Sequence, residues 1–180
     1  MRRVASLLIL SLLAARGGPA WAGSQRAGET ACWFENGAVV APAAIDGIAG
    51  DYVIDLSAPH TLLHIDIAQR AGFTETALVL PVRLAGRRVD AALITVQSLD
   101  YRAVGFSTPI VGIIGADILD RYKVTLDFSP CRLRLERPGS PLRGRKGGLP
   151  VTMVDGVPTV VAAASDGFRG LSGPFALDTA

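Results

Sequence analysis

The sequence predicts an all-β fold with one or two short helices. Its apolar residues are mainly Val, Leu, Ile and Ala, in runs of roughly four to eight residues separated by glycine-containing turns, which is typical of short strands. Only residues 65–71, which end at Gly72, and residues 116–122, which follow Gly115, have helical spacing. The expected strands cover residues 37–45, 51–54, 78–84, 89–99, 123–128 and 132–136.

Residues 1–22 have the three parts of a secretory signal peptide. Arg2 and Arg3 form a basic start, residues 4–15 are apolar, and the chain then reads Ala-Trp-Ala up to Ala22, which fits the small-x-small cleavage pattern. The apolar part has about 12 residues, whereas a membrane span needs roughly 20. We expect cleavage near Ala22, export to the periplasm or the cell exterior, and no permanent membrane span.

The charge argues against a nucleic-acid partner. The whole chain has a formal charge of +2 at pH 7, but the signal peptide holds three arginines and no acid, so its removal leaves about −1. Nucleic-acid binding needs a basic stripe, and none is present. We therefore expect no nucleic-acid partner.

Residues 137–148 separate two units. They read RPGSPLRGRKGG, which combines Pro, Gly and basic residues without apolar periodicity. We interpret this segment as a solvated linker; a patch for an anionic partner is the alternative. Residues 23–136 then form a first unit, and residues 149–180 begin a second.

The two cysteines and the two histidines are candidates for a disulfide and for a metal pair. Cys32 and Cys131 meet an oxidising compartment after export, so a disulfide between them and two unpaired cysteines are both compatible with the sequence. His60 and His64 are four positions apart, but the residues between them are strand-like and no third ligand is near. We expect no metal site.

An internal repeat is the most informative feature of the chain. VVAPAAIDGIAGDYVIDLSA around Asp55 and PTVVAAASDGFRGLSGPFALDTA around Asp178 share the order strand, Asp-Gly turn, strand, Asp and small residues. An aspartate at the end of a strand is by default a turn residue that bonds its own backbone. Its repetition favours a catalytic position instead. Because the second copy stops at Ala180, we expect the 180 residues to be a truncated product or fragment.

Three segments resemble the retropepsin-like aspartic proteases, in particular bacterial exported proteins with two related lobes. YVIDLSAPHTLL is similar to the family's Asp-Thr-Gly-Ala loop, and GIIGADILDRYKVTLDF is similar to its apolar-apolar-Gly-x-Asp segment. PFALDTA is similar to the opening of a second lobe. The resemblance implies a small closed acid-protease barrel in residues 23–136 and a truncated second lobe in residues 149–180.

The resemblance also implies peptide-bond hydrolysis by an aspartate dyad. Asp55 and Asp178 would share one proton, so that one activates a water while the other protonates the substrate carbonyl. Each lobe supplies one aspartate, so the second comes from the second lobe or from a homodimer. The mechanism needs no cofactor, and the expected partner is a peptide or protein substrate.

The loop residues have expected roles in this family. Thr179 matches the threonine whose hydroxyl bonds the opposite loop, whereas Leu56 has no hydroxyl and is expected to impair catalysis. Ser57 and Ala180 stand where the family has glycine, and Ala58 completes the first loop. A catalytically inactive module that binds a peptide or partner is the alternative function, and a purely structural envelope domain is a third.

The supporting segments have expected positions as well. Gly115 is expected to let the chain pass close beneath the Asp55 loop, and Asp117 to support that loop or a helix start without taking part in catalysis. The hairpin around Gly86 lies where the family carries a flap over the substrate cleft.

Overall fold

The computed structural model describes residues 28–140 and 147–180 of the chain. The expected signal peptide and residues 141–146 of the expected linker lie outside the described residues. Within these described ranges there are three short helices, α1 (Ile65–Arg70), α2 (Asp100–Ala103) and α3 (Ala116–Leu119). The strands are β1 (Glu29–Ala31), β2 (Trp33–Glu35), β3 (Ala38–Ile45), β4 (Ile48–Ile54), β5 (Thr61–His64), β6 (Ala77–Leu84), β7 (Arg87–Gln97), β8 (Ile110–Ile114), β9 (Lys123–Phe128), β10 (Cys131–Glu136), β11 (Val151–Val154), β12 (Val157–Ser165) and β13 (Gly170–Ala176).

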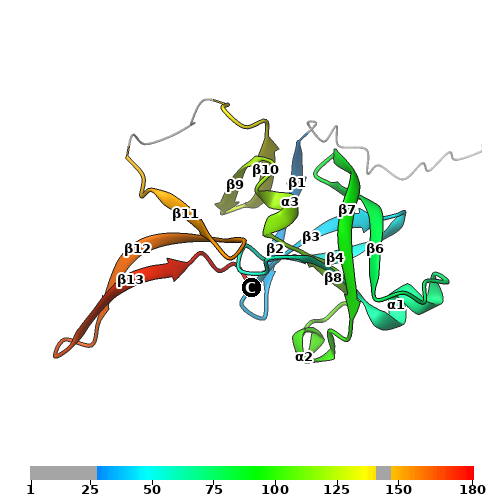
Figure 1. The fold of residues 1–180 in the computed structure, drawn as a ribbon, viewed down its shortest axis with the longest axis horizontal. Coiled ribbons are helices and arrows are strands. Elements are labelled where there is room, and N and C mark those ends of the chain that lie inside the picture. Colours follow the sequence, from blue (N-terminus) through cyan, green and yellow to red (C-terminus); the bar gives the residue numbers. More distant parts are fainter. Residues whose placement is uncertain (1–27, 141–146) are drawn as a thin grey trace, which may run out of the picture.

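A closed barrel forms the main body of the molecule. Its strands follow the order β3-β4-β8-β5-β7-β6, and β6 also pairs with β3, which closes the ring (Figure 1). The β4–β8 and β5–β7 pairings are parallel and the others are antiparallel. The mostly β fold and the closed barrel confirm the predicted fold class.

Strand β3 shows why the barrel sequences read as continuous apolar runs. Val39, Ala41 and Ile45 belong to the main core cluster, whereas Ala38 and Val40 belong to a second cluster on the other side of the strand. Side chains alternate between the faces of a strand, so a strand covered on both faces is apolar at nearly every position. The second cluster lies next to the C-terminus, because Ala180 packs against it.

Two-residue turns define the hairpins of both sequence copies. Asn36-Gly37 links β2 to β3 with φ values of 50° and 82°, and Asp155-Gly156 links β11 to β12 with 50° and 80°. Positive φ at both central positions is the geometry of the type I′ turns that suit β-hairpins. The structural repeat therefore begins one strand earlier than the sequence copies suggested, with β2 corresponding to β11.

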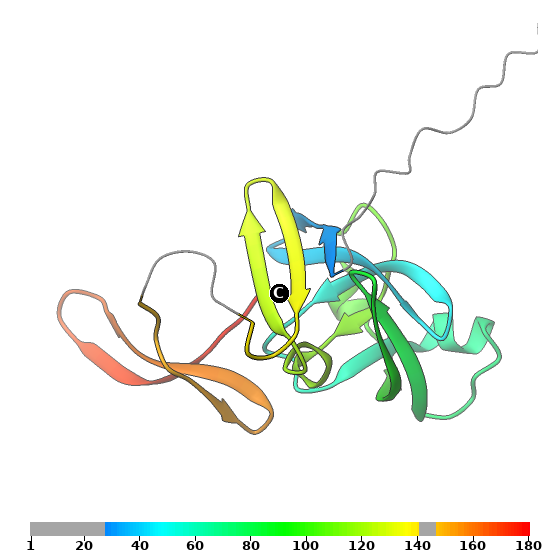
Figure 2. The same ribbon diagram turned by 90° about the horizontal axis from the view of Figure 1, so that it is seen from above.

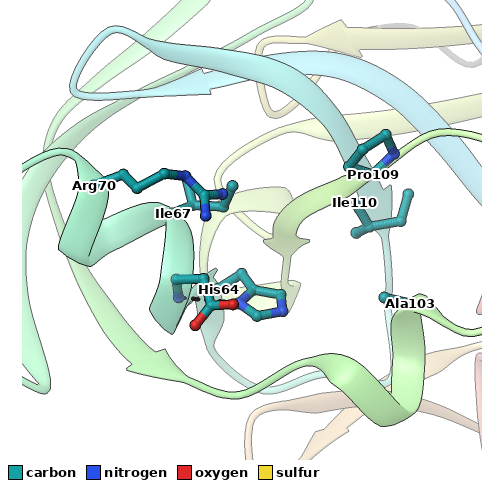
Figure 3. A pocket seen from close by; sticks show the side chains of 7 residues that line it. His64, Ile67, Arg70, Ala103, Pro109 and Ile110 are labelled. Carbon is teal, nitrogen blue, oxygen red and sulfur yellow. Dashed lines mark hydrogen bonds between the residues drawn. The ribbon is translucent and has the colours of Figure 1, made fainter.

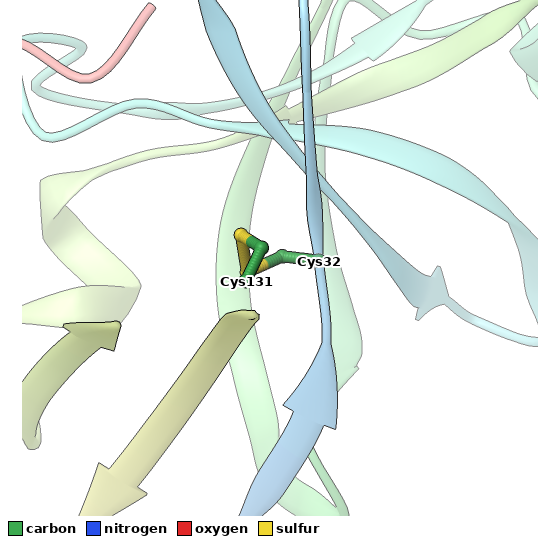
Figure 4. Close-up of a disulfide and its surroundings, with 2 residues drawn as sticks. All are labelled: Cys32 and Cys131. Atoms are coloured by element: carbon green, nitrogen blue, oxygen red, sulfur yellow. A yellow bond between two sulfur atoms is a disulfide. The ribbon is translucent and has the colours of Figure 1, made fainter. Parts of the chain in front are cut away.

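A second sheet, in the order β1-β10-β9, carries the disulfide. Cys32 follows β1 and Cys131 begins β10; their sulfur atoms are bonded at 2.04 Å, and their Cα atoms are 5.0 Å apart (Figure 4). Of the two alternatives that the sequence left open, the structure contains the bonded one. The bond joins the N-terminal strand to the β9–β10 hairpin across 99 positions.

The third sheet, β11-β12-β13, extends away from the barrel (Figures 1 and 2). Its chain returns to the barrel after β13, so that the C-terminus lies near the middle of the molecule. Most of its side chains are exposed, including the apolar residues Val151, Met153, Val154, Val161, Phe168 and Leu171.

The structure contains several elements that the sequence patterns did not predict, namely strands β1, β2, β8 and β11 and helix α2. Strand β8 is buried at all five positions, so it lacks the alternation of apolar and polar residues that marks a half-buried strand. Helix α2 has four residues and no buried side chain, so it has no apolar periodicity to detect. Among the described residues, no helix is long and apolar enough to cross a membrane.

Candidate active site

Asp55 directly follows β4, and its side chain is fully buried. Its backbone N–H donates to the carbonyl of Ile114 in β8 at 3.1 Å. The oxygen Oδ1 accepts hydrogen bonds from Ser57 N at 2.8 Å, Ser57 Oγ at 2.7 Å and Ala58 N at 3.1 Å. The loop therefore fixes Oδ1 through its own backbone, as in an ordinary Asx turn, and leaves Oδ2 for another partner.

Ser57 contributes more to this loop than its place in the motif indicates. Its hydroxyl donates to Asp55 Oδ1, so the serine that stands in place of the family's glycine adds one donor to the carboxylate. Hydrogen bonds to a charged acceptor are stronger than those between neutral groups. Ser57 thus restricts rotation of the Asp55 carboxylate.

Gly115 lies directly beneath the loop. A Cβ atom at this position would be 2.6 Å from the carbonyl oxygen of His60 and 2.7 Å from that of Ala58. Ala116 N donates to the same Ala58 oxygen at 2.8 Å. Only glycine lets the chain from β8 to α3 pass this close to the loop, because any side chain would overlap backbone atoms.

Thr61 and Asp117 connect the loop to α3. The buried hydroxyl of Thr61 donates to Asp117 Oδ1 at 2.7 Å and accepts from Gly115 N at 3.1 Å. Asp117 Oδ1 also accepts from Ile118 N at 3.0 Å. The Asp117 carboxylate therefore supports the loop from below. Thr61 belongs to the matched motif YVIDLSAPHTLL, but its partners, which are more than 50 positions away, were not predicted.

Thr179 joins the second repeat to the first. Its hydroxyl donates to the carbonyl of Ile54 at 2.7 Å and accepts from the backbone N–H of Leu56 at 3.1 Å. Val39 N donates to the carbonyl of Thr179 at 2.9 Å. We call these three hydrogen bonds the Thr179 bridge. They attach the C-terminal segment to the residues on both sides of Asp55.

Asp178, the counterpart of Asp55 in the second repeat, is exposed. Its Oδ1 accepts from Ala180 N at 2.9 Å, which is the same bond to the second following residue that Asp55 forms with Ser57. The two aspartates therefore have the same local turn. Their surroundings differ, because only Asp55 has a complete barrel around it.

Leu56 and Pro158 line one pocket between the barrel and the third sheet. The pocket has a volume of about 250 Å³, and Val151 and Met153 of β11 contribute to its wall. Pro158 is one residue into β12, where Val39 stands in β3, so the two are structural counterparts. Val39 donates its N–H to the Thr179 bridge, whereas Pro158 has no N–H to donate and Leu56 has no hydroxyl. The reciprocal half of the bridge is therefore apolar.

Arg102 of α2 is the partner of the second Asp55 oxygen. Its Nη1 lies 3.3 Å from Asp55 Oδ2. Helix α2 is held at Asp100, whose carboxylate contacts His64 Nε2 at 3.1 Å and Ser98 Oγ at 2.7 Å. These two contacts, that of Ser98 first, lower the pKa of Asp100. No sequence motif pointed to Arg102.

The hairpin around Gly86 does not occupy the position of a flap. Its tip is attached to the sheet of β1 and β10, because Gly28 N donates to the carbonyl of Ala85 at 2.8 Å and Arg87 Nε donates to that of Leu135 at 3.1 Å. The side chain that contacts the Asp55 carboxylate from outside its loop is Arg102 of α2. Placement by order along the chain was wrong for this hairpin, since order does not determine which way a hairpin folds.

His64 ends β5 and caps α1. Its Nδ1 accepts from Asp66 N at 3.2 Å, so Nε2 carries the proton that faces Asp100. His64 also lines a small cavity of about 130 Å³ together with Arg70 and Ala103 (Figure 3). His60 is exposed at the other end of the strand. Within the described residues, no group of three or more His, Cys, Asp or Glu side chains is arranged to hold a metal ion.

Comparison with known proteins gives similarities at the level of structure. No family model matches the chain, and no curated protein matches it. A retropepsin-like aspartic protease from Rickettsia conorii is similar at 19% identity with a TM-score of 0.45, covering 60% of this chain and 90% of that one. The retroviral protease-like domain of Ddi1 from Leishmania major is similar at 19% identity with a TM-score of 0.38, covering 58% of this chain and 97% of that one.

Proposed function

We propose that the chain belongs to an exported aspartic-type endopeptidase in which Asp55 and Asp178 form the catalytic dyad. The observation that carries this proposal is the Thr179 bridge, which attaches the residue next to Asp178 to the residues next to Asp55. Two turn aspartates without a common role have no need of hydrogen bonds between their loops. The repeat of the same Asx turn at both positions is further support.

The proposed mechanism uses the two oxygens of Asp55 differently. Oδ1 is held by Ser57 and Ala58, so Oδ2 is the oxygen that would take the proton of the attacking water. Asp178 in its protonated form would donate to the substrate carbonyl oxygen as the water attacks the carbon. As the C–N bond breaks, the proton gained by Asp55 goes to the leaving amide nitrogen, and a hydroxyl of the tetrahedral intermediate returns a proton to Asp178. Such a pair titrates as a unit, so its pH profile reports both carboxylates together.

The second aspartate could come from the same chain or from a second copy. Thr179 occupies the position opposite Leu56, and this supports Asp178 over a second Asp55. In a dimer of two first units, two Leu56 residues would face each other without a hydroxyl. Export is supported by residues 1–22 and by the Cys32–Cys131 disulfide, since disulfides persist mainly in oxidising compartments.

A module that binds peptides without cutting them is the second candidate. Leu56 and the contact between Arg102 and Asp55 favour it. The first removes a hydroxyl that the family uses, and the second occupies the oxygen that the mechanism needs.

Cleavage of a peptide library by the purified protein tests the proposal. We expect cleavage that pepstatin inhibits and that Asp55→Asn and Asp178→Asn each abolish. Asp46→Asn is the matched control, because it changes an aspartate with a φ of 47°, a conformation that asparagine also adopts. Peptide binding that persists in Asp55→Asn, with no cleavage by the parent protein, would favour the binding module.

A further inference from the structure

The guanidinium of Arg102 covers the Oδ2 oxygen of Asp55 in this structure. The Asp55 side chain has no exposed surface, whereas the Arg102 side chain is 34% exposed, and Arg102 Nη1 lies 3.3 Å from Asp55 Oδ2. The guanidinium therefore connects the buried carboxylate to the surface. In the proposed mechanism, this oxygen must face the attacking water, so the contact has to open before any reaction.

Arg102 has further N–H groups that can donate to another acceptor. A guanidinium carries several N–H groups in a planar fork, and the structure pairs only Nη1 with a side-chain oxygen. Its other described contact is with the Tyr101 ring, 6.0 Å from the ring centre. The nearest acid on the same helix, Asp100, is already bonded to His64 and Ser98. Within residues 28–140 and 147–180, no second carboxylate contacts Arg102.

The Arg102 side chain can turn away from Asp55 without disturbing the core. None of the four residues of α2 is buried, and the helix has no side-chain cap. The neighbouring segment is attached through Asn36 Nδ2, which donates to the carbonyl of Val104 at 2.9 Å, and through the Glu35 carboxylate, which accepts from Ser107 N. Turning the Arg102 side chain breaks one ion pair and exposes little apolar surface.

We propose that Arg102 is a specificity residue that selects peptides carrying an acidic side chain. In the empty protein its guanidinium covers Asp55. An Asp or Glu side chain of the bound peptide forms a bidentate ion pair with the guanidinium, whose geometry matches a carboxylate. Arg102 then leaves Asp55, and Oδ2 becomes free. The same contact anchors the peptide beside Asp55. This inference rests on the proposed function, because it names the substrate class of that site.

Two measurements on the full-length protein test the inference without requiring cleavage. The first is the rate at which an aryl glycidyl ether, an epoxide that esterifies accessible carboxylates, labels Asp55, followed by peptide mapping. The second is calorimetric binding of an acetylated peptide that contains two glutamates, compared with its twin that contains glutamines at the same positions.

We expect Arg102→Gln to label at Asp55 about tenfold faster than the parent and to bind the glutamate peptide roughly tenfold more weakly, as loss of a charge-assisted pair predicts. The glutamine twin should bind the parent and the variant equally. Arg102→Lys keeps the charge but loses the fork, and should lie between them. Arg70→Gln, on α1 beside the small cavity, is the matched control and should change neither measurement.

Unchanged labelling in Arg102→Gln, with the fold verified by circular dichroism, would overturn the inference. Equal affinity of the parent for the two peptides would also overturn it. These outcomes are separate from those of the proposed function. If the protein cleaves neutral peptides as well as acidic ones, the proposed enzyme function stands and the inferred specificity is wrong. Glutamate-dependent binding without cleavage would support Arg102 as the acid-binding residue of a module that does not cut.

Discussion

The hydroxyl of Thr179 accepts a hydrogen bond from the backbone N–H of Leu56, although 123 positions separate the two residues. The same hydroxyl donates to the carbonyl of Ile54, so one side chain spans the residue that carries the buried carboxylate. The C-terminal repeat thus holds the loop of the N-terminal repeat by a polar contact. The contact in the opposite direction is apolar, because Leu56 has no hydroxyl and lines a pocket with Pro158.

Thr179→Val should weaken the attachment of the C-terminal segment. The substitution keeps the shape of the side chain but removes a donor and an acceptor from a partly buried site, which costs about 1–3 kcal/mol. Urea unfolding measures the loss in the free energy of unfolding. Thr179→Ser retains the hydroxyl and should recover most of it; equal losses in the two variants would contradict a role for the hydroxyl.

Leu56→Thr should separate the two candidate functions. An enzyme with an impaired loop should gain peptide-cleavage activity, because the new hydroxyl restores the reciprocal bond between the loops. A binding module should gain none. The smaller side chain should lower the free energy of unfolding by about 1–2 kcal/mol, since it leaves part of the pocket unfilled. Leu56→Val removes a similar volume without adding a hydroxyl and controls for the packing effect.

Removal of the disulfide should destabilise the chain strongly. The bond closes a loop with a sequence separation of 99, and the loss of a cross-link over that length corresponds to about 4–5 kcal/mol in the chain-entropy account. Unfolding of Cys32→Ser/Cys131→Ser by guanidinium should therefore have a lower midpoint than that of the oxidised parent. A reductant should shift the parent and leave the double variant unchanged. A shift of both would indicate another effect of the reductant.

Gly115→Ala should be among the most damaging small substitutions. The added methyl group would lie 2.6 Å from a backbone oxygen of the loop, and neither backbone segment can move without breaking the hydrogen bond from Ala116 to Ala58. We expect a loss of about 3 kcal/mol. Thermal unfolding measures this loss. Gly173→Ala, which adds the same methyl group in open space on β13, should be nearly neutral in that measurement.

The predictable part of the site lies within short stretches of sequence. The Asp-Gly turns, the apolar strands and the place of Asp55 at the end of β4 all follow from local patterns, because turn chemistry and strand periodicity act over a few residues. The positive φ values at Asp46 and Gly47 agree with the hairpin expected there. The expected and observed bounds of β3 differ by one residue.

The parts that escaped prediction depend on distant partners. Arg102 reaches Asp55 from a four-residue helix with no apolar pattern, and Thr61 meets Asp117 across 56 positions. The effect of Pro158 is seen only when β12 is aligned with β3. Its counterpart Val39 donates an N–H to the Thr179 carbonyl, whereas proline has no N–H. These contacts follow from the closure of the barrel and the return of the C-terminal segment, which no local pattern encodes.

Because Leu56 and Pro158 are apolar, the two repeats offer different hydrogen-bonding groups to a partner loop. Two copies of the first repeat would bring together loops that both lack the hydroxyl, so neither would satisfy the N–H groups of the other. The second repeat offers a hydroxyl and a carbonyl, and the first offers the N–H of Val39 and Leu56 to meet them. The contacts of this junction therefore fit the pairing of the two unlike repeats better than the pairing of two first repeats.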